Sequence, residues 1–346
     1  SGWGVYARDM RPQFHPALVN DAFGDPGLYI DCLFARRALL FDLGDIRALP
    51  PKKLLRVSDV FVSHAHMDHF MGFDWLLRLL LGRAHTIRLY GPPHFLDQVE
   101  HRLAGYTWNL VGSYDTDFTF DVTEVSTDGC ARRARFRCKS AFRREDENET
   151  AITDGVLRDE DEFCVRSVFL DHQTPCLAFA LEEKQHINVW KNRLDELGLP
   201  TGPWLNELKR AVRTGEADDR PFPVRWRDRH GAHERVFTLG QLRREALRFV
   251  PGQKIVYVTD AVYHADNAAR ITALAHAADY LYIEAPFLDA DSERARSRYH
   301  LTAHQAGLMA RAARARSIVP FHFSPVYEED GGEALRREMM QAWQFG

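Results

Sequence analysis

The 346-residue chain carries 45 Lys and Arg against 49 Asp and Glu, and 45% of its residues are hydrophobic. This composition is that of an ordinary globular protein with a substantial core, and the net charge of −4 gives no global sign of a nucleic-acid partner. No apolar run approaches the ~18 residues that a membrane span needs, the N-terminal residues do not resemble a secretory signal, and the five cysteines form no C-x-x-C pair. We therefore expect free thiols and a cytoplasmic protein without a membrane segment.

Short apolar runs bounded by Gly, Pro or charged residues dominate the first part of the chain and predict β-strands. The predicted strands are Leu28–Leu33, Ala38–Asp42, Val57–Ser63 and Thr86–Tyr90. Apolar residues at helical spacing predict helices over Phe70–Arg83 and Phe95–Leu103.

Residues 113–181 are predicted to form further strands. Within them the basic string RRARFRCKSAFRR is followed at once by the acidic string EDENE. A hairpin with solvated outer charges is the simpler interpretation, and a phosphate-binding role is the alternative.

Residues 184–248 differ in character from the rest of the chain. They carry 14 Lys and Arg against 9 Asp and Glu, and LGLPTGP interrupts a helical stretch. The buried-strand runs IVYVTD, YLYIEAP and SIVPFHF follow, separated by helices. We predict one α/β domain over residues 1–346 with a protruding arm inserted at about 184–235.

The strongest local signal is the run from Ser63 to His69, which follows the apolar strand DVFV. It places four potential metal ligands within six residues: His64, His66, Asp68 and His69. Imidazole and carboxylate suit zinc and similar divalent ions, and burying so many ionisable groups without a metal would be costly. The alternative interpretation is a polar loop that happens to be rich in histidine and binds no metal.

The pattern H-x-H-x-D-H resembles the signature of the metallo-β-lactamase superfamily. That resemblance implies an αββα sandwich, in which two mixed sheets are covered by outer helices. The superfamily's remaining ligands would be His172 in FLDHQTP, Asp260 in VTDAVY and His322 in PFHFSPVY, each where a predicted strand gives way to a loop. Taken singly, His172 could be a core histidine and Asp260 a helix N-cap.

The resemblance also implies how the ligands are shared between two metal ions. Asp260 would bridge both ions; His64, His66 and His172 would hold one, and Asp68, His69 and His322 the other. Zinc is the expected metal, two ions per chain, with manganese or iron as alternatives.

Two residues have expected supporting roles in this centre. Asp68 is placed to orient the attacking water as well as to bind metal. Asp42, in LFDLGD, resembles a carboxylate that supports a ligand histidine, although it could be merely a turn residue at a strand end.

Within the superfamily, residues 28–327 most resemble ribonuclease Z, the tRNA 3′-processing endonuclease. HINVWKNRLDELGLPTGPWLNELKRAVRTG is similar to that family's protruding arm. YIEAPF followed by SRYHLTAHQAG is similar to its acid pair, here Glu284 and His300, in which the histidine protonates the leaving oxygen. HFSPVY is similar to its metal histidine followed by a phosphate-contacting serine, here Ser324.

Several positions depart from that family's pattern. Ile283 stands where a histidine usually precedes the glutamate, Pro286 where a threonine usually follows, and Val326 where arginine is common. Asp260 is flanked by Thr259 and Ala261 in place of the usual Gly and Thr. These departures leave the metal ligands and the acid in place but weaken the expected grip on phosphate.

Four functions remain open at this point. The first is a ribonuclease Z-like phosphodiesterase that cleaves the tRNA 3′ trailer, grips RNA phosphates through its arm and forms a homodimer. The second is a phosphodiesterase acting on a small molecule such as a cyclic nucleotide or cyclic phosphate. The third is a thioesterase or lactonase on the same scaffold, and the fourth is a metal-stabilised RNA-binding protein without turnover.

Overall fold

The computed structural model describes residues 13–33 and 35–346, so most of the N-terminal segment judged above for a signal lies outside the described residues. The chain divides into two compact units. The first comprises residues 1–159, 164–182 and 253–346, and the second comprises 160–163 and 183–252.

The first unit contains two mixed β-sheets. In the first sheet the strands follow the order β1-β2-β3-β4-β5-β6-β7-β8, with β9 paired to β7. These strands are β1 (Phe14–Leu18), β2 (Leu28–Cys32), β3 (Arg37–Phe41), β4 (Val57–Phe61), β5 (Thr86–Gly91), β6 (Thr119–Val125), β7 (Cys130–Arg137), β8 (Arg144–Asp146) and β9 (Thr150–Ala151). The strands from β3 to β6 are parallel, so their carboxyl ends lie along one edge.

The second sheet has the order β10-β11-β12-β17-β18-β19. Its strands are β10 (Val156–Asp159), β11 (Phe163–Asp171), β12 (Pro175–Glu183), β17 (Lys254–Val258), β18 (Tyr280–Glu284) and β19 (Ile318–Phe321). The last three strands are parallel, so the loops that follow them emerge on the same side.

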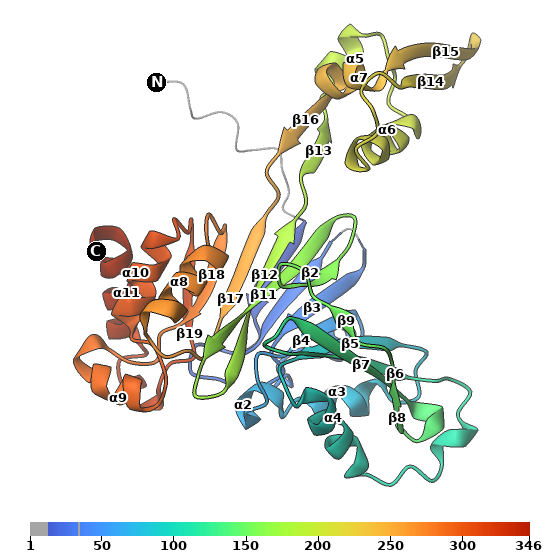
Figure 1. Ribbon diagram of the computed structural model, residues 1–346. Helices are drawn as coiled ribbons and strands as arrows, with labels where there is room; N and C mark the ends of the chain where they lie inside the picture. The colour runs from blue at the N-terminus through green and yellow to red at the C-terminus, as the bar shows by residue number, and fades with distance from the viewer. Residues whose placement is uncertain (1–12, 34) are drawn as a thin grey trace. The chain divides into compact units, whose positions relative to one another are not determined.

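Helices cover the outer faces of both sheets and make four layers (Figure 1). On the first sheet α3 (Phe73–Leu80) and α4 (Phe95–Ala104) share one apolar core with the strands. On the second, α8 (Ala265–Leu274), α10 (Ala303–Ala312) and α11 (Glu333–Phe345) share another. Between the sheets Phe41 stacks on Phe179 at 5.2 Å and contacts Tyr257 at 5.9 Å. The predicted αββα sandwich is confirmed.

One predicted helix is wrong in its bounds. The sequence predicts a single helix over Phe70–Arg83, but the chain forms α2 (Met67–Phe70) and α3, which begins after Gly72. A Cβ at Gly72 would lie 2.1 Å from the Gly44 carbonyl oxygen. The chain therefore approaches the loop after β3 too closely for a side chain, and α2 begins within the predicted ligand run.

The second unit has its own small core. Its elements are β13 (His186–Val189), α5 (Lys191–Glu196), α6 (Trp204–Arg213), β14 (Pro221–Asp228), β15 (Gly231–Thr238), α7 (Leu239–Ala246) and β16 (Leu247–Val250). Trp204, Leu208, Phe222 and Leu242 are buried together in it. The arm predicted from sequence ends at about residue 235, which lies within β15. The compact unit continues to Gly252 because α7 packs on the same core and β16 pairs with β13.

The basic string in residues 132–144 forms part of an antiparallel pair, β7 with β8. Five of its six arginines form ion pairs; Arg133 lies 2.8 Å from Asp121, for example, and Arg135 lies 2.8 Å from Glu147. The positive charges are thus neutralised locally, which favours the hairpin interpretation over phosphate binding.

Candidate metal centre and acid pair

The candidate site residues lie where strands of the first unit end. Asp42 follows β3, the run from His64 to His69 follows β4, and His172 follows β11. Asp260 follows β17, Glu284 is the last residue of β18, and His322 follows β19. All the metal ligands predicted from the sequence come from these loops.

One group of potential ligand atoms consists of His64, His66, His172 and Asp260, all within 4.8 Å of one another. The Asp260 Oδ2 atom lies 3.2 Å from His172 Nε2 and 3.5 Å from His64 Nε2. Burial lowers the pKa of His64 to about 4, so its ring is neutral at pH 7 and offers a lone pair.

A second group consists of Asp68, His69 and His322. Asp260 reaches this group as well, because its Oδ2 lies 3.4 Å from His69 Nε2 and its Oδ1 lies 2.9 Å from His322 Nδ1. Burial alone would raise the pKa of Asp260, but the His322 and His69 rings outweigh it and hold the pKa well below its ordinary value. Asp260 is therefore an anion between the two groups.

The donor set fits divalent metal ions. The buried Nε2 atoms of His64 and His69 have no hydrogen-bond partner, although each ring faces carboxylates. Buried polar atoms are rarely left unsatisfied, and such atoms within a His/Asp cluster are accounted for by metal ligation. These clusters are the candidate ligands of a metal-binding site.

Asp42 holds one of the candidate ligands, His69, in place. The fully buried Asp42 carboxylate lies 2.8 Å from His69 Nδ1 and accepts hydrogen bonds from Ser63 N (2.7 Å), Ser63 Oγ (2.9 Å) and the Tyr257 hydroxyl (2.8 Å). Holding Nδ1 of His69 leaves Nε2 directed toward the ligand cluster. Sequence reasoning named Asp42 but missed Ser63 and Tyr257 as its partners.

Strained backbone accompanies these contacts. Asp42, Gln173, Tyr299 and His322 all have φ near +60°, at 61°, 60°, 59° and 60° respectively. Non-glycine residues in this region cost free energy and persist where surrounding contacts fix them. Each of the four is a site residue or the direct neighbour of one.

Glu284 and His300 form a third group beside the metal ligands. Glu284 Oε2 lies 2.8 Å from His300 Nδ1, and Oε1 accepts hydrogen bonds from Leu301 N (2.9 Å) and Ala261 N (3.2 Å). Burial opposes a charged ring, but the Glu284 carboxylate raises the pKa of His300 above its ordinary value. Although Glu284 and His300 could ligate a metal with Asp260 and His322, the Glu284 oxygens are already occupied by N–H donors.

Ser324 lies two residues beyond His322, at the start of a short 3-10 turn, η4 (Pro325–Tyr327). Its backbone N–H donates to the Pro286 carbonyl at 3.2 Å, while its hydroxyl makes no cap hydrogen bond to the turn. The side chain is partly exposed, and its predicted contact with phosphate stays a prediction.

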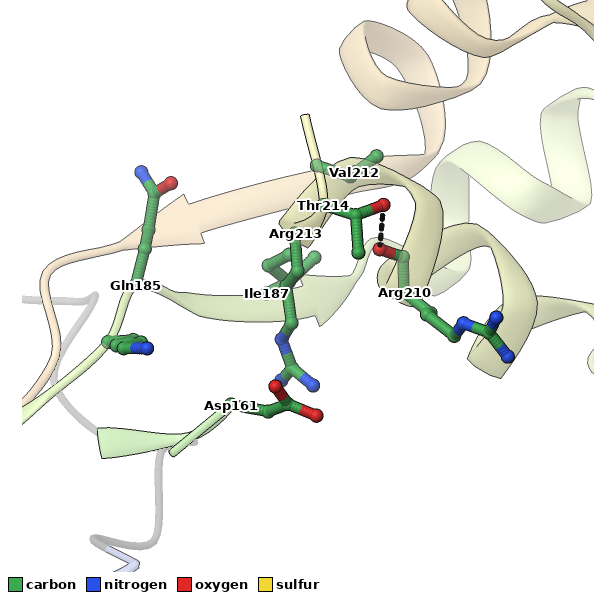
Figure 2. Close-up of a pocket in the computed structure, with 8 residues that line it drawn as sticks. Asp161, Gln185, Ile187, Arg210, Val212, Arg213 and Thr214 are labelled. Carbon is green, nitrogen blue, oxygen red and sulfur yellow. Dashed lines mark hydrogen bonds between the residues drawn. The ribbon is translucent and has the colours of Figure 1, made fainter. Parts of the chain in front are cut away.

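The second unit holds a separate cavity of about 460 Å³. It is lined by Asp161, Lys184, Gln185, Ile187, Arg210, Val212, Arg213 and Thr214. Figure 2 shows Arg210 and Arg213 leaving the last turn of α6 in different directions. Basic side chains on a cavity wall can contact an anionic ligand.

Comparison with known proteins agrees with this geometry. No protein-family model matches the chain. The chain is 33% identical over 334 residues to a protein named Ribonuclease Z from Deinococcus radiodurans, covering 95% of this chain and 94% of the relative. A Ribonuclease Z from Crocosphaera subtropica is 28% identical over 289 residues, covering 82% and 74%. Among solved structures, the metallo-β-lactamase fold protein YhfI from Bacillus subtilis aligns with a TM-score of 0.51 at 15% identity, covering 95% and 94%.

The four layers are those of the metallo-β-lactamase fold, and together with the Ribonuclease Z relative they define the class of metal-dependent hydrolases. Within that class the chain belongs to the ribonuclease Z family, because it matches a Ribonuclease Z at more than 30% identity over nearly its whole length. The resemblance stated from the sequence is confirmed. Across the part of the chain that the structure describes, no helix is long and apolar enough to cross a membrane.

Proposed function

We propose that this protein is a metal-dependent phosphodiesterase that cleaves RNA endonucleolytically, with the 3′ trailer of precursor tRNA as its substrate. The observation that carries the proposal is the Glu284–His300 pair at 2.8 Å beside the metal ligands. An RNA alkoxide is a poor leaving group that needs a proton, and a positioned imidazolium can supply it.

Seven residues would hold two ions, most suitably zinc: His64, His66, Asp68, His69, His172, Asp260 and His322. When bound, such ions lower the pKa of a water and balance the charge that develops on the phosphorus oxygens. Binding RNA would bring the scissile phosphate against the cluster, between Asp68 and His300.

Asp68 orients the attacking water in this proposal. Burial would raise the pKa of Asp68, but hydrogen bonds from His322 and His69 lower it, so the carboxylate is ionised and can accept a hydrogen bond from the water. On the other side, His300 uses Nδ1 to contact Glu284 and keeps Nε2 for the leaving oxygen. Ser324 would contact a phosphate oxygen at the rim.

The second unit would bind the body of the tRNA through the Lys and Arg side chains of residues 184–248, by phosphate contacts, across a homodimer as in the resembling family. The five cysteines are all free, which supports a reducing compartment such as the cytoplasm.

Small-molecule phosphodiesters and thioesters or lactones are less favoured substrates. Membership of the ribonuclease Z family argues for RNA, and a thiolate departs without the acid that Glu284 holds in place. The test is to assay a 3′-extended tRNA, bis(p-nitrophenyl) phosphate, a thymidine p-nitrophenyl phosphate and a thioester side by side. Cleavage of the tRNA at its 3′ end, with no thioester turnover, is the expected result; a thioester turned over faster than both diesters contradicts the proposal.

A further inference from the structure

Three arginines lie on and directly after the short helix α9 (Ser292–Ser297), immediately before the acid residue His300: Arg294, Arg296 and Arg298. All three side chains are exposed. None of them forms an ion pair with any acidic side chain in residues 13–33 and 35–346. The mechanism proposed above does not use them.

The backbone of this segment is fixed to the active site. The Tyr299 carbonyl accepts a hydrogen bond from Nδ1 of the metal ligand His172 at 2.7 Å. The His300 N–H donates to the Ala295 carbonyl at 2.9 Å, inside α9. The arginines therefore belong to a segment whose backbone also positions the proposed metal ligand His172 and the proposed acid His300.

Arg294 is held in place by an aromatic ring. Its guanidinium lies 5.8 Å from the centroid of Phe287, and the Phe287 ring lies 6.2 Å from the His300 ring. Phe287 is buried, at 2% exposure. This cation–π contact leaves the guanidinium N–H groups free to bind a phosphate, and it reduces the side-chain entropy lost on binding.

The acidic residues of the neighbouring turn form no ion pair with these arginines, as far as residues 13–33 and 35–346 are concerned. Asp291 is contacted by the Tyr327 hydroxyl, and Asp289 accepts a hydrogen bond from Thr302 Oγ1 at 3.4 Å. Residues 289–298 carry three acids and three arginines, so the arginines are distinguished by their exposure and their lack of an ion pair, and not by a net positive charge of the segment.

The adjoining turn η4 offers no cation. Val326 is 51% exposed there and precedes Tyr327, whose hydroxyl contacts Asp291 just before α9 and accepts a hydrogen bond from Leu288 N at 3.1 Å. An aliphatic side chain cannot bind phosphate. On this rim of the active site the positive charge thus comes from α9.

We propose that Arg294 and Arg298 form a phosphate-binding rim beside His300, which grips the RNA backbone at phosphates flanking the scissile one. The two residues are four positions apart and so share a helix face, whereas Arg296 lies on another face. Guanidinium forks recognise phosphate oxygens through paired hydrogen bonds. This inference rests on the proposed RNA-cleaving function.

The experiment compares Arg294→Ala, Arg298→Ala and the double variant with Arg296→Ala as the matched control on the same helix. Each rim variant should raise KM for a 3′-extended tRNA about 10- to 100-fold, the usual worth of a charged hydrogen bond. A plot of log K for tRNA binding against log salt concentration should become less steep. Its slope should decrease in magnitude by about 0.7–0.9 for each arginine that no longer binds a phosphate. Hydrolysis of bis(p-nitrophenyl) phosphate, which has no flanking phosphate, should stay within about twofold of wild type.

Two further variants separate phosphate binding from a structural role. Arg294→Lys should retain part of the affinity, and Val326→Arg in the Arg294→Ala background should restore part of it, because both return a cation to the rim. Thermal midpoints of all variants should match wild type. An effect of Arg296→Ala equal to those of the rim variants, or rim variants with unchanged KM and salt slope, overturns the inference while leaving the proposed function standing. A wild-type protein that cleaves bis(p-nitrophenyl) phosphate but neither binds nor cleaves tRNA overturns the proposed function and the rim together.

Discussion

His300 Nδ1 lies 2.8 Å from Glu284 Oε2, and the same carboxylate is fixed by two backbone N–H groups, of Leu301 and Ala261. The glutamate therefore cannot rotate away without breaking three hydrogen bonds. Its negative charge raises the pKa of His300 above the ordinary value, so more of the imidazolium, the acid form, is present at neutral pH. The relationship links backbone geometry directly to the proposed proton transfer.

His300→Ala should slow cleavage of RNA, which has a poor alcohol leaving group, by about 10²–10⁴-fold, the usual worth of a positioned acid. With p-nitrophenolate as the leaving group the loss should be much smaller, because that group departs without a proton. Steady-state rates on both substrates check this, with His101→Ala, an exposed histidine on α4, as control. Glu284→Gln should give the same pattern in weaker form. Equal losses on both substrates would mean that His300 positions the substrate or supports the fold.

Asp260→Ala should abolish metal binding more completely than His69→Ala, because Asp260 reaches both ligand groups and His69 only one. Elemental analysis of purified wild-type protein should find about two transition-metal ions per chain, chiefly zinc. Asp266→Ala, an exposed carboxylate six residues further on, should keep both ions. The whole site proposal fails if wild-type protein contains no transition metal and added zinc does not raise its thermal midpoint.

Asp42→Asn should weaken metal affinity about 10- to 100-fold, as is usual for a residue that orients a ligand histidine. The amide keeps the size of the side chain but removes the charge that His69, Ser63 and Tyr257 contact. Competition against a chelator of known affinity measures the change. Asp45→Asn should have no effect, because that carboxylate pairs at the surface with Arg47. Unchanged metal affinity in the Asp42 variant would show that the carboxylate only stabilises the turn that follows β3.

That the candidate ligands lie together could be predicted from sequence, because each follows an apolar strand and parallel strands bring their carboxyl ends together. The carbonyl of Tyr299 that holds His172 could not, because a backbone contact across 127 positions leaves no trace in residue type. The β14–β15 hairpin was also missed. Its alternation of buried Phe222 and Val224 with exposed residues is that of a strand, but Pro221 and Pro223 and the many charges conceal it.

The bounds of the second unit show a similar limit. Its sequence turns from helical to strand patterns within a few residues, and its core draws on both, with Trp204 from α6 and Phe222 from β14. Composition marks where the basic region begins, whereas its end depends on pairing between β13 and β16. Such pairing between distant residues is set by three-dimensional contacts.

The last prediction concerns the second unit. Replacing residues 184–251 with a short Gly-Ser linker should leave hydrolysis of bis(p-nitrophenyl) phosphate nearly unchanged, because every candidate metal ligand and the candidate acid pair belong to the first unit. Affinity for tRNA should be lost. In the intact protein that affinity should fall steeply with salt, because each phosphate contact releases counterions.

A milder variant tests the same unit without removing its core. Arg210→Gln with Arg213→Gln removes two positive charges from the wall of the cavity in Figure 2 while α6 keeps its buried face. It should lower the salt slope of tRNA binding by about 0.7–0.9 for each arginine that binds a phosphate in the wild-type protein and leave the thermal midpoint unchanged. Arg225→Gln, whose side chain is already paired with Glu234, is the matched control. If the linker variant binds tRNA as tightly as the intact protein, the second unit is not the RNA-binding element and the substrate is held by the first unit alone.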